Sequence, residues 1–397
     1  MSTKNNNQPE ILYGSVVTPA GIIEDGALVM QDGILQYVGD AAEIPAALKK
    51  EAVQSETRSG YLLPGFIDIH VHGGNGADFM DASQDALDRI TSFHASQGTT
   101  SMLATTMTAP KDRIEHVLAE VNAYISRGSD YAQLAGVHLE GPFISPKWPG
   151  AQNPEHIAAP NVSWAQEWQS SYPGLIKQLT LAPERDGALE LISWLRDHDI
   201  TPALGHTDAS FEEVEAAVEA GLRHAVHTFN AMTPLHHRKP GVVGAVMYDQ
   251  RIEAEVIADG IHVHPAAVAV LARLKRDHNL ILITDAMSAA GLEDGHYTIG
   301  DLPVIVQGGV ARLEDGVTLA GSTLTMIEGF RFLVQKVGLS ITEASLAASL
   351  NPAMSIGIDK RTGSLEAGKQ ADVLFLGPDL DLKSVWIQGK PLPPQSL

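Results

Sequence analysis

The sequence predicts an α/β protein, a (β/α)8 or TIM barrel that carries a small β domain formed from both ends of the chain. Three observations support this prediction. Strand-like apolar runs alternate with helical stretches through the middle of the chain, short strands with turns occupy its two ends, and polar side chains recur where the apolar runs end.

The central part of the chain alternates between two patterns. Apolar runs of strand length are followed by stretches with helical periodicity, such as 211–220 and 265–277, which is typical of a parallel sheet with crossover helices. Eight such units in about 250 residues have the size of a TIM barrel, and a doubly wound open sheet is the main alternative. The expected strands are 66–72, 99–107, 134–140, 177–182, 201–206, 224–230, 252–258 and 280–285.

Both ends of the chain have a different pattern, in which short strands are separated by turns. An Asp-Gly pair between two of the apolar runs is a hairpin signal. The segments with this pattern are 11–14, 27–30, 34–39, 296–319, 371–376 and 385–390. We therefore expect a small β domain from residues 1–63 and 363–397, with part of 292–318, beside a barrel domain of residues 64–362.

The composition excludes several classes of partner and site. The chain has 397 residues, a formal charge of −21 and no cysteine. The acidic excess argues against nucleic acid or an anionic membrane surface as a partner. Without thiolates, a metal ion would be held by His, Asp, Glu or water. The polar N-terminus does not resemble a signal peptide, and no apolar run approaches the ~20 residues of a membrane span, so a cytoplasmic location is expected.

Two histidines lie at the end of the first barrel strand. Side chains two residues apart in a strand point to the same face, so His70 and His72 leave the strand together while Val71 faces the other way. A rigid element that presents two imidazoles suits one metal ion. By itself the pair is weak evidence, because two ordinary histidines near a strand end have the same spacing.

Further metal-type side chains follow the later strands. The carboxyl ends of barrel strands meet at one mouth, so these side chains are expected to surround one or two divalent ions. Nitrogen-rich ligation suits zinc, iron, manganese or cobalt better than magnesium or calcium. The residues are His70, His72, Glu140, His206, His227 and Asp285. Histidines in helical or loop stretches are expected at the surface: His94, His116, His156, His198 and His278.

Asp285 is the candidate acid and base. A metal ion with an open position lowers the pKa of a bound water to about 7. A carboxylate beside that water can take its proton and later deliver it to a leaving group. Asp285 ends the last strand, so the sequence predicts a hydrolase of amides or similar bonds.

A locally basic loop follows the strand that ends in His227. Arg238 in this loop presents a planar fork of donors that suits phosphate or carboxylate. A solvated loop is the simpler interpretation. However, the loop follows His227 and Asn230 directly, so we expect it to lie over the same mouth.

Seven motifs occur along the chain: Pro64–Gly73 (PGFIDIHVHG), His138–Phe143 (HLEGPF), Gly205–Thr207 (GHT), His227–Met232 (HTFNAM), Ala258–His262 (ADGIH), Thr284–Met287 (TDAM) and Leu319–Ser322 (LAGS). In this order they resemble the N-acetylglucosamine-6-phosphate deacetylases of the amidohydrolase superfamily. The segment 258–265 is also similar to the N-acetylgalactosamine-6-phosphate deacetylases of the same group. The flanks fit the small β-sandwich of the family.

The resemblance implies roles for individual positions. The main metal ligands would be Glu140, His206 and His227, with His70 and His72 as the pair that supports a second metal in the members that have it. Asp285 matches the catalytic acid and base. Zinc is the expected ion, with iron, manganese or cobalt as alternatives.

The resemblance also implies a substrate pocket and a homodimer. The positions that match it are Ala151, Gln152, Asn230, Ala231, Arg238, Asp259, Gly260, Ile261, His262, Leu319, Ala320 and Gly321. Arg238 and His262 match the phosphate ligands, and in the family the arginine reaches the neighbouring active site across the dimer interface.

One position departs from the family. The family usually has histidine where Gln152 stands, and that histidine helps to polarise the acetyl carbonyl. Glutamine donates a hydrogen bond but carries no positive charge, so oxyanion stabilisation is expected to depend more on metal.

The expected activity is metal-dependent hydrolysis of the acetamide of an N-acetylhexosamine 6-phosphate, N-acetylglucosamine 6-phosphate first, to acetate and the hexosamine 6-phosphate, a step of amino-sugar catabolism. The galacto epimer is the alternative substrate. More distant alternatives are another amidohydrolase reaction, a sugar-phosphate binder without catalysis and a metal-free phosphosugar isomerase, which would leave the histidines unexplained.

Overall fold

The computed structural model describes residues 8–54, 59–275 and 279–393. Its centre is a sheet of eight parallel strands in the order in which they occur along the chain, which confirms the predicted barrel. All eight expected strands are present, and several are shorter than expected. The strands are β8 (Phe66–Asp68), β11 (Thr99–Thr106), β12 (Gln133–Glu140), β13 (Ile176–Leu181), β14 (Thr201–Leu204), β15 (His224–Ala225), β16 (Glu253–Ile257) and β17 (Leu280–Ile283).

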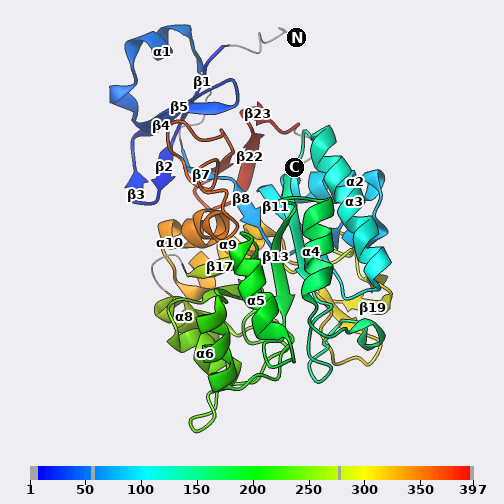
Figure 1. Ribbon diagram of the computed structural model, residues 1–397. Helices are drawn as coiled ribbons and strands as arrows, with labels where there is room; N and C mark the ends of the chain where they lie inside the picture. Colours follow the sequence, from blue (N-terminus) through cyan, green and yellow to red (C-terminus); the bar gives the residue numbers. More distant parts are fainter. Residues whose placement is uncertain (1–7, 55–58, 276–278, 394–397) are drawn as a thin grey trace.

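Helices connect consecutive barrel strands and cover the outside of the sheet (Figure 1). The first seven crossover helices are α2 (Gln84–Ser96), α3 (Lys111–Arg127), α4 (Val162–Ser171), α5 (Ala188–Asp197), α6 (Phe211–Ala220), α7 (Gly241–Tyr248) and α8 (Pro265–Leu274). After β17 follow α9 (Met326–Phe332), α10 (Ile341–Ser345) and α11 (Asn351–Ser355), with π-helical turns at Leu333–Val337 and Leu346–Leu350. Helix α6 begins as its sequence predicts, because Ser210 and Glu213 form a capping box.

The first and last barrel strands are joined by polar contacts at their carboxyl ends. The Thr284 hydroxyl donates to the carboxylate of Asp68, and the Asp285 backbone N–H donates to the His70 carbonyl at 2.9 Å. These contacts bring the segment after β8 beside the segment after β17. The first histidine pair and Asp285 therefore share one mouth.

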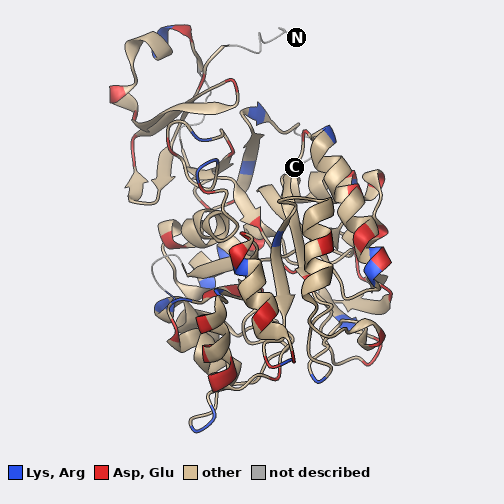
Figure 2. Cartoon of the chain, in the orientation of Figure 1, with Lys and Arg blue, Asp and Glu red and all other residues tan. Residues whose placement is uncertain are grey.

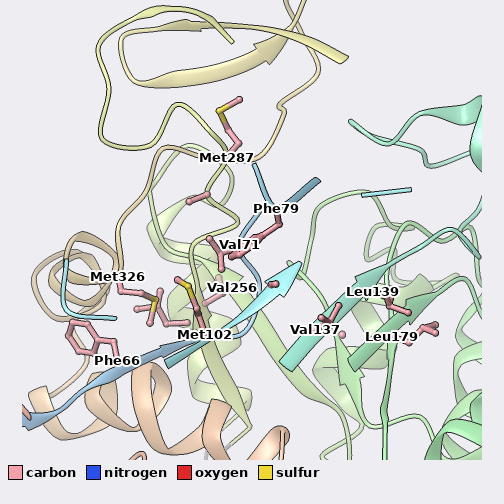
Figure 3. Close-up of a cluster of buried hydrophobic side chains, with 14 of the residues drawn as sticks. Phe66, Val71, Phe79, Met102, Val137, Leu139, Leu179, Val256, Met287 and Met326 are labelled. Atoms are coloured by element: carbon pink, nitrogen blue, oxygen red, sulfur yellow. The ribbon is translucent and has the colours of Figure 1, made fainter. Parts of the chain in front are cut away.

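Apolar side chains fill the space between the strands and helices. Figure 3 shows part of this cluster, in which Phe66, Met102, Val137 and Val256 come from different strands. All four are buried, as expected for a parallel sheet covered by helices. This packing gives the site a rigid base.

The two chain ends form two further sheets. One contains β5 (Ile34–Asp40), β4 (Gly26–Gln31), β1 (Glu10–Tyr13) and β6 (Val53–Gln54); the other contains β23 (Lys390–Pro391), β22 (Leu382–Ile387), β21 (Val373–Leu376), β7 (Tyr61–Pro64), β2 (Ser15–Thr18) and β3 (Gly21–Ile23). Strand β7 pairs with β21, so the two ends meet within one sheet. Figure 1 shows this part at the top of the view, close to both termini.

The segment 295–313 differs from the prediction. It forms a separate three-stranded sheet of β18 (Gly295–Ile299), β19 (Leu302–Gln307) and β20 (Val310–Leu313). Figure 1 shows β19 at the lower right, on the opposite side of the barrel from the chain-end sheets. The placement of part of 292–318 with the chain ends is therefore wrong. A strand pattern predicts pairing but not the sheet in which a hairpin pairs.

The remaining elements are short: helix α1 (Ala46–Glu51), strands β9 (Gly73–Gly74) and β10 (Ala77–Asp78), and 3-10 turns at Ala41–Glu43, Phe79–Asp81 and Pro154–His156. Within the described ranges, no helix is both long and apolar enough to cross a membrane.

Candidate metal centre and substrate pocket

The predicted ligands lie at or just beyond the carboxyl ends of their strands. Glu140 is the last residue of β12, and His206 and His227 lie two residues beyond β14 and β15. His70 and His72 follow the end of β8 by two and four residues. The structure thus brings together residues that are far apart in the sequence.

Three of the predicted metal-ligating and catalytic residues have a left-handed backbone that L-residues rarely adopt. The φ angles are 47° at His206, 28° at His227 and 52° at Asp285. Such conformations cost on the order of 1–3 kcal/mol each and persist only where the surroundings hold them. Their concentration at the barrel mouth supports a functional role for this region.

Glu140 lies at the centre of the imidazoles. Its Oε1 is 3.2 Å from His70 Nε2, 3.2 Å from His206 Nε2 and 3.0 Å from His227 Nε2. Its Oε2 is 3.3 Å from His72 Nε2. Burial alone would raise the pKa of Glu140, but His70, His206 and His227 outweigh burial and hold this pKa well below its ordinary value. The carboxylate is therefore ionised.

This donor set fits a divalent metal ion. The Nε2 atoms of His206 and His227 are 3.1 Å apart and face the same carboxylate oxygen. The Nε2 of His70 is buried and has no hydrogen-bond partner among the described residues. A cation between these atoms would satisfy all of them. Two groups have ligand atoms within 4.8 Å of one another, His70 with His72 and Glu140, and Glu140 with His206 and His227.

Asp285 lies beside the histidine pair and reaches the open cavity. Its Oδ1 is 3.2 Å from His72 Nε2 and 3.7 Å from His70 Nε2. Burial raises the pKa of Asp285, but the hydrogen bond from His72 and the charge of His70 more than offset it, so the pKa lies below its ordinary value. Asp285 is thus a carboxylate placed to accept a proton at the mouth.

The side chain of Gln152 contacts Glu140 directly. Its side-chain amide donates to Glu140 Oε2, and its carbonyl oxygen accepts the Thr108 backbone N–H at 2.6 Å. The residue is buried. One donor of this glutamine is therefore directed to Glu140 and its acceptor to the backbone, which is a different task from a cationic histidine that polarises a carbonyl.

The site opens into a cavity of about 500 Å³. The predicted residues that line it are His72, Glu140, Ala151, Gln152, His206, His227, Asn230, Ala231, His262, Asp285, Leu319 and Gly321. Residues that sequence reasoning missed are Met107, Lys147, Trp148, Pro149, Gly150, Ile299, Val317 and Thr318. Most of the missed residues lie in loops, which carry no periodic signal.

Other predicted residues support the wall without lining it. Asp259 accepts the backbone N–H groups of Ile261 and His262 at 2.8 and 2.9 Å, and its Oδ2 is 2.6 Å from His262 Nδ1. It thereby fixes the His262 ring. The Ser322 N–H donates to the Asp285 carbonyl at 2.7 Å, so the turn at Ala320 and Gly321 is held beside the last barrel strand.

Arg238 lies elsewhere on the same chain. It lines a second, open hollow of about 890 Å³ together with residues such as Asp208 and Thr233, and its side chain is exposed. Figure 2 shows Lys and Arg on the loop that projects at the bottom of the view. Arg238 is a predicted phosphate ligand, but it does not line the 500 Å³ cavity that holds the predicted metal ligands of the same chain.

His94 and Glu255 are both buried, and the sequence predicted neither position. His94 is fully buried, with Nε2 2.9 Å from the Gly73 carbonyl, so its expected surface position is wrong, and His278 lies outside the described residues. Glu255, fully buried on β16, is a further residue near the site that the motifs do not include. A glutamate in the middle of a strand expected to be buried on both faces is the signal that identifies Glu255, since a buried carboxylate needs partners.

The fold and the sequence both match known proteins. Residues 61–392 match the model of the amidohydrolase family. The N-acetylglucosamine-6-phosphate deacetylase of Thermotoga maritima superposes with a TM-score of 0.86 at 34% identity, over 96% of this chain and 99% of that one. The chain belongs to the amidohydrolase family.

Within that family the similarity is to sugar-phosphate deacetylases. The N-acetylglucosamine-6-phosphate deacetylase of Bacillus subtilis is 42% identical over 93% of both chains. The N-acetylgalactosamine-6-phosphate deacetylase of Escherichia coli O157:H7 is 39% identical, over 94% of this chain and 97% of that one. A variant of the Mycobacterium smegmatis deacetylase, solved with N-acetyl-D-glucosamine-6-phosphate, gives a TM-score of 0.90 at 32% identity, over 97% and 99% of the chains.

Proposed function

We propose that this protein hydrolyses the acetamide of an N-acetylhexosamine 6-phosphate, N-acetylglucosamine 6-phosphate first, to acetate and the hexosamine 6-phosphate. The observation that carries the proposal is the cluster of four histidines and two carboxylates at the mouth of a 500 Å³ cavity, in a chain 42% identical to a deacetylase of this kind. A phosphorylated amino sugar fits a cavity of this volume.

In this proposal, one group of residues hydrolyses the acetamide and another binds the phosphate of the same substrate. A divalent ion held by Glu140, His206 and His227, with His70 and His72 available for a second, would supply Lewis acidity and a more acidic water. Asp285 takes the proton of the attacking water and returns it to the departing amine nitrogen. His262, fixed by Asp259, binds the phosphate and so positions the acetamide at the other end.

The galacto epimer is the second candidate substrate. The observation that favours it is the 39% identity to an N-acetylgalactosamine-6-phosphate deacetylase. The two sugars differ only in the direction of the 4-hydroxyl, so a few contacts in the cavity wall decide between them. A sugar-phosphate binder without catalysis is disfavoured because Asp285 and the ligand set are intact.

The remaining features of the proposal concern the ion, the assembly and the location. Zinc is the first choice because imidazole-rich sites suit it, with iron, manganese or cobalt as alternatives and one or two ions per subunit. The protein is a homodimer in which Arg238 reaches the phosphate in the neighbouring cavity, consistent with its absence from its own. It acts in the cytoplasm, because a charged sugar phosphate does not cross membranes freely.

The test measures acetate release from both epimers after metal removal and after addition of zinc. Metal-dependent release from either sugar supports the reaction, and the ratio of kcat/KM identifies the substrate. No release from either sugar by metal-loaded protein would contradict the proposal and direct attention to another amide, with Gln152 as the first residue to examine.

A further inference from the structure

The interior of the barrel holds a further buried carboxylate, Glu255 on β16, that lines none of the cavities described above. Its Oε2 is 2.8 Å from His70 Nδ1, and its Oε1 is 2.8 Å from His224 Nε2. Its Oε1 also accepts the side-chain amide of Gln178 at 3.0 Å. The carboxylate is thus surrounded by nitrogen atoms.

These contacts assign the proton positions. Both oxygens of Glu255 already accept N–H groups, Oε1 from the Gln178 side-chain amide and Oε2 from the His227 backbone, so the carboxylate acts here as an acceptor. An ionised carboxylate only accepts hydrogen bonds. The Nδ1 of His70 must therefore carry the proton, and Nε2 is the atom left to bind a metal.

The same carboxylate also contacts the second ligand group. Its Oε2 accepts the backbone N–H of His227 at 3.2 Å. The backbone of His227 is left-handed, with φ of 28°. Because this conformation is unfavourable for histidine, the hydrogen bond helps to hold the ring toward Glu140.

We propose that Glu255 is a positioning residue for the metal centre, one that fixes the tautomer of His70 and the backbone of His227 and so connects the two ligand groups. This inference rests on the proposed metal site. Carboxylates behind metal-binding histidines typically contribute 10–100-fold to metal affinity. Because Glu255 contacts the His70 ring directly and His227 only through its backbone, the His70 group depends on it most.

The chain provides a matched control on the same strand. Glu253 lies two residues earlier and contacts the other side of His224, with its Oε2 3.1 Å from Nδ1. It has no contact with His70 or His227 in the described structure, and its side chain is 23% exposed. Changing Glu253 therefore disturbs the outer partner of His224 and leaves the ligands in place.

The first experiment measures zinc affinity by competition with a chromophoric chelator for wild type, Glu255→Gln and Glu253→Gln. We expect the zinc affinity of the group that contains His70 to fall about 10–100-fold in Glu255→Gln, with little change in Glu253→Gln. Equal affinity of Glu255→Gln and wild type would overturn the inference, as would an equal loss in both variants. Failure of wild type itself to bind metal would instead contradict the proposed function.

The second experiment needs no Glu255 variant to fold. Nitrogen-15 chemical shifts of labelled histidines in the zinc-loaded wild type report which ring nitrogen is protonated, and His70→Asn identifies the His70 signals. We expect a protonated Nδ1 and a metal-bound Nε2. A metal-bound or unprotonated Nδ1 would overturn the proposed role of Glu255.

Discussion

At the scale of single residues, the candidate site consists of carboxylates that several histidines share. Glu140 faces four Nε2 atoms on the cavity side, while Glu255 accepts from Nδ1 of His70 and Nε2 of His224 inside the barrel. His70 lies between the two carboxylates. A buried arrangement of this kind is stable only when each group has a partner, so changes at single positions are expected to have large effects.

Replacing Asp285 by asparagine tests its role as acid and base. Asparagine keeps the size of the side chain but cannot accept a proton from water, so turnover should fall by about 10²–10⁴-fold. Metal content should stay close to wild type because the proposed ligands are unchanged. The measurements are kcat for acetate release and metal per subunit; a kcat near wild type would contradict the assignment.

At the scale of elements, the barrel is completed by a polar contact between its first and last strands. The Thr284 hydroxyl donates to Asp68, and burial raises the pKa of Asp68 to about 7 despite this bond. Both residues are fully buried. The contact joins β8 to β17 just below the histidine pair and Asp285.

Thr284→Val keeps the shape of the side chain and removes this hydrogen bond. A buried polar group left without its partner costs about 1–3 kcal/mol, so the melting temperature of the metal-free protein should fall. Thr99→Val is the control, because the Thr99 hydroxyl is buried without a hydrogen-bond partner among the described residues. Equal melting temperatures for the two variants would contradict the proposed contribution.

The end of α8 provides a pH-dependent test. Lys275 is buried and donates to the carbonyls of Asp249 and Ile252 at 2.6 and 2.8 Å, and burial lowers its pKa from 10.5 to about 8. Between these values the unfolded chain binds more protons, so the contribution of Lys275 to stability is present above pH 10.5 and is lost as pH falls through 8.

Lys275→Met should remove this dependence. The free energy of unfolding of wild type relative to the variant should therefore rise by on the order of 1–3 kcal/mol between pH 8 and pH 10. Chemical denaturation of both proteins at several pH values measures the difference. A difference that is independent of pH would show that the lysine is not the titrating group.

At the scale of the whole molecule, the cavity of one chain contains His262 but not Arg238. The chain carries a formal charge of −21, so a phosphate needs local cations to approach and bind. Lys147 also lines the cavity but is paired with Asp208, and the proposed dimer would add Arg238 from the partner as a further cation. Two-fold symmetry would then complete both sites at once.

Mixed dimers test this arrangement. In a dimer of one Arg238→Ala chain and one Asp285→Asn chain, the first chain keeps its Asp285 and receives an arginine from the second. Random mixing should thus restore wild-type KM for the phosphorylated sugar in about a quarter of the sites. If Arg238 acted within its own chain, no mixture would exceed the two separate proteins.

The alternation of apolar runs and helical stretches predicted a parallel sheet covered by helices, and the polar residues at the carboxyl ends of its strands favoured a barrel over an open sheet. The motifs at the strand ends likewise indicated the candidate metal ligands, because parallel strands place their carboxyl ends at one mouth. The positions of His206 and His227 at the barrel mouth were therefore predictable. Nothing in the sequence indicates the left-handed backbone that directs their side chains toward Glu140.

Only the tertiary structure decided which residues from separate elements meet. The hairpins in 295–313 joined one another beside the mouth rather than the chain ends, because strand patterns do not specify a partner sheet. Gln152 turned toward Glu140, and Glu255 came to lie behind His70. Each of these contacts joins residues distant in sequence, and their distances depend on how the whole barrel closes.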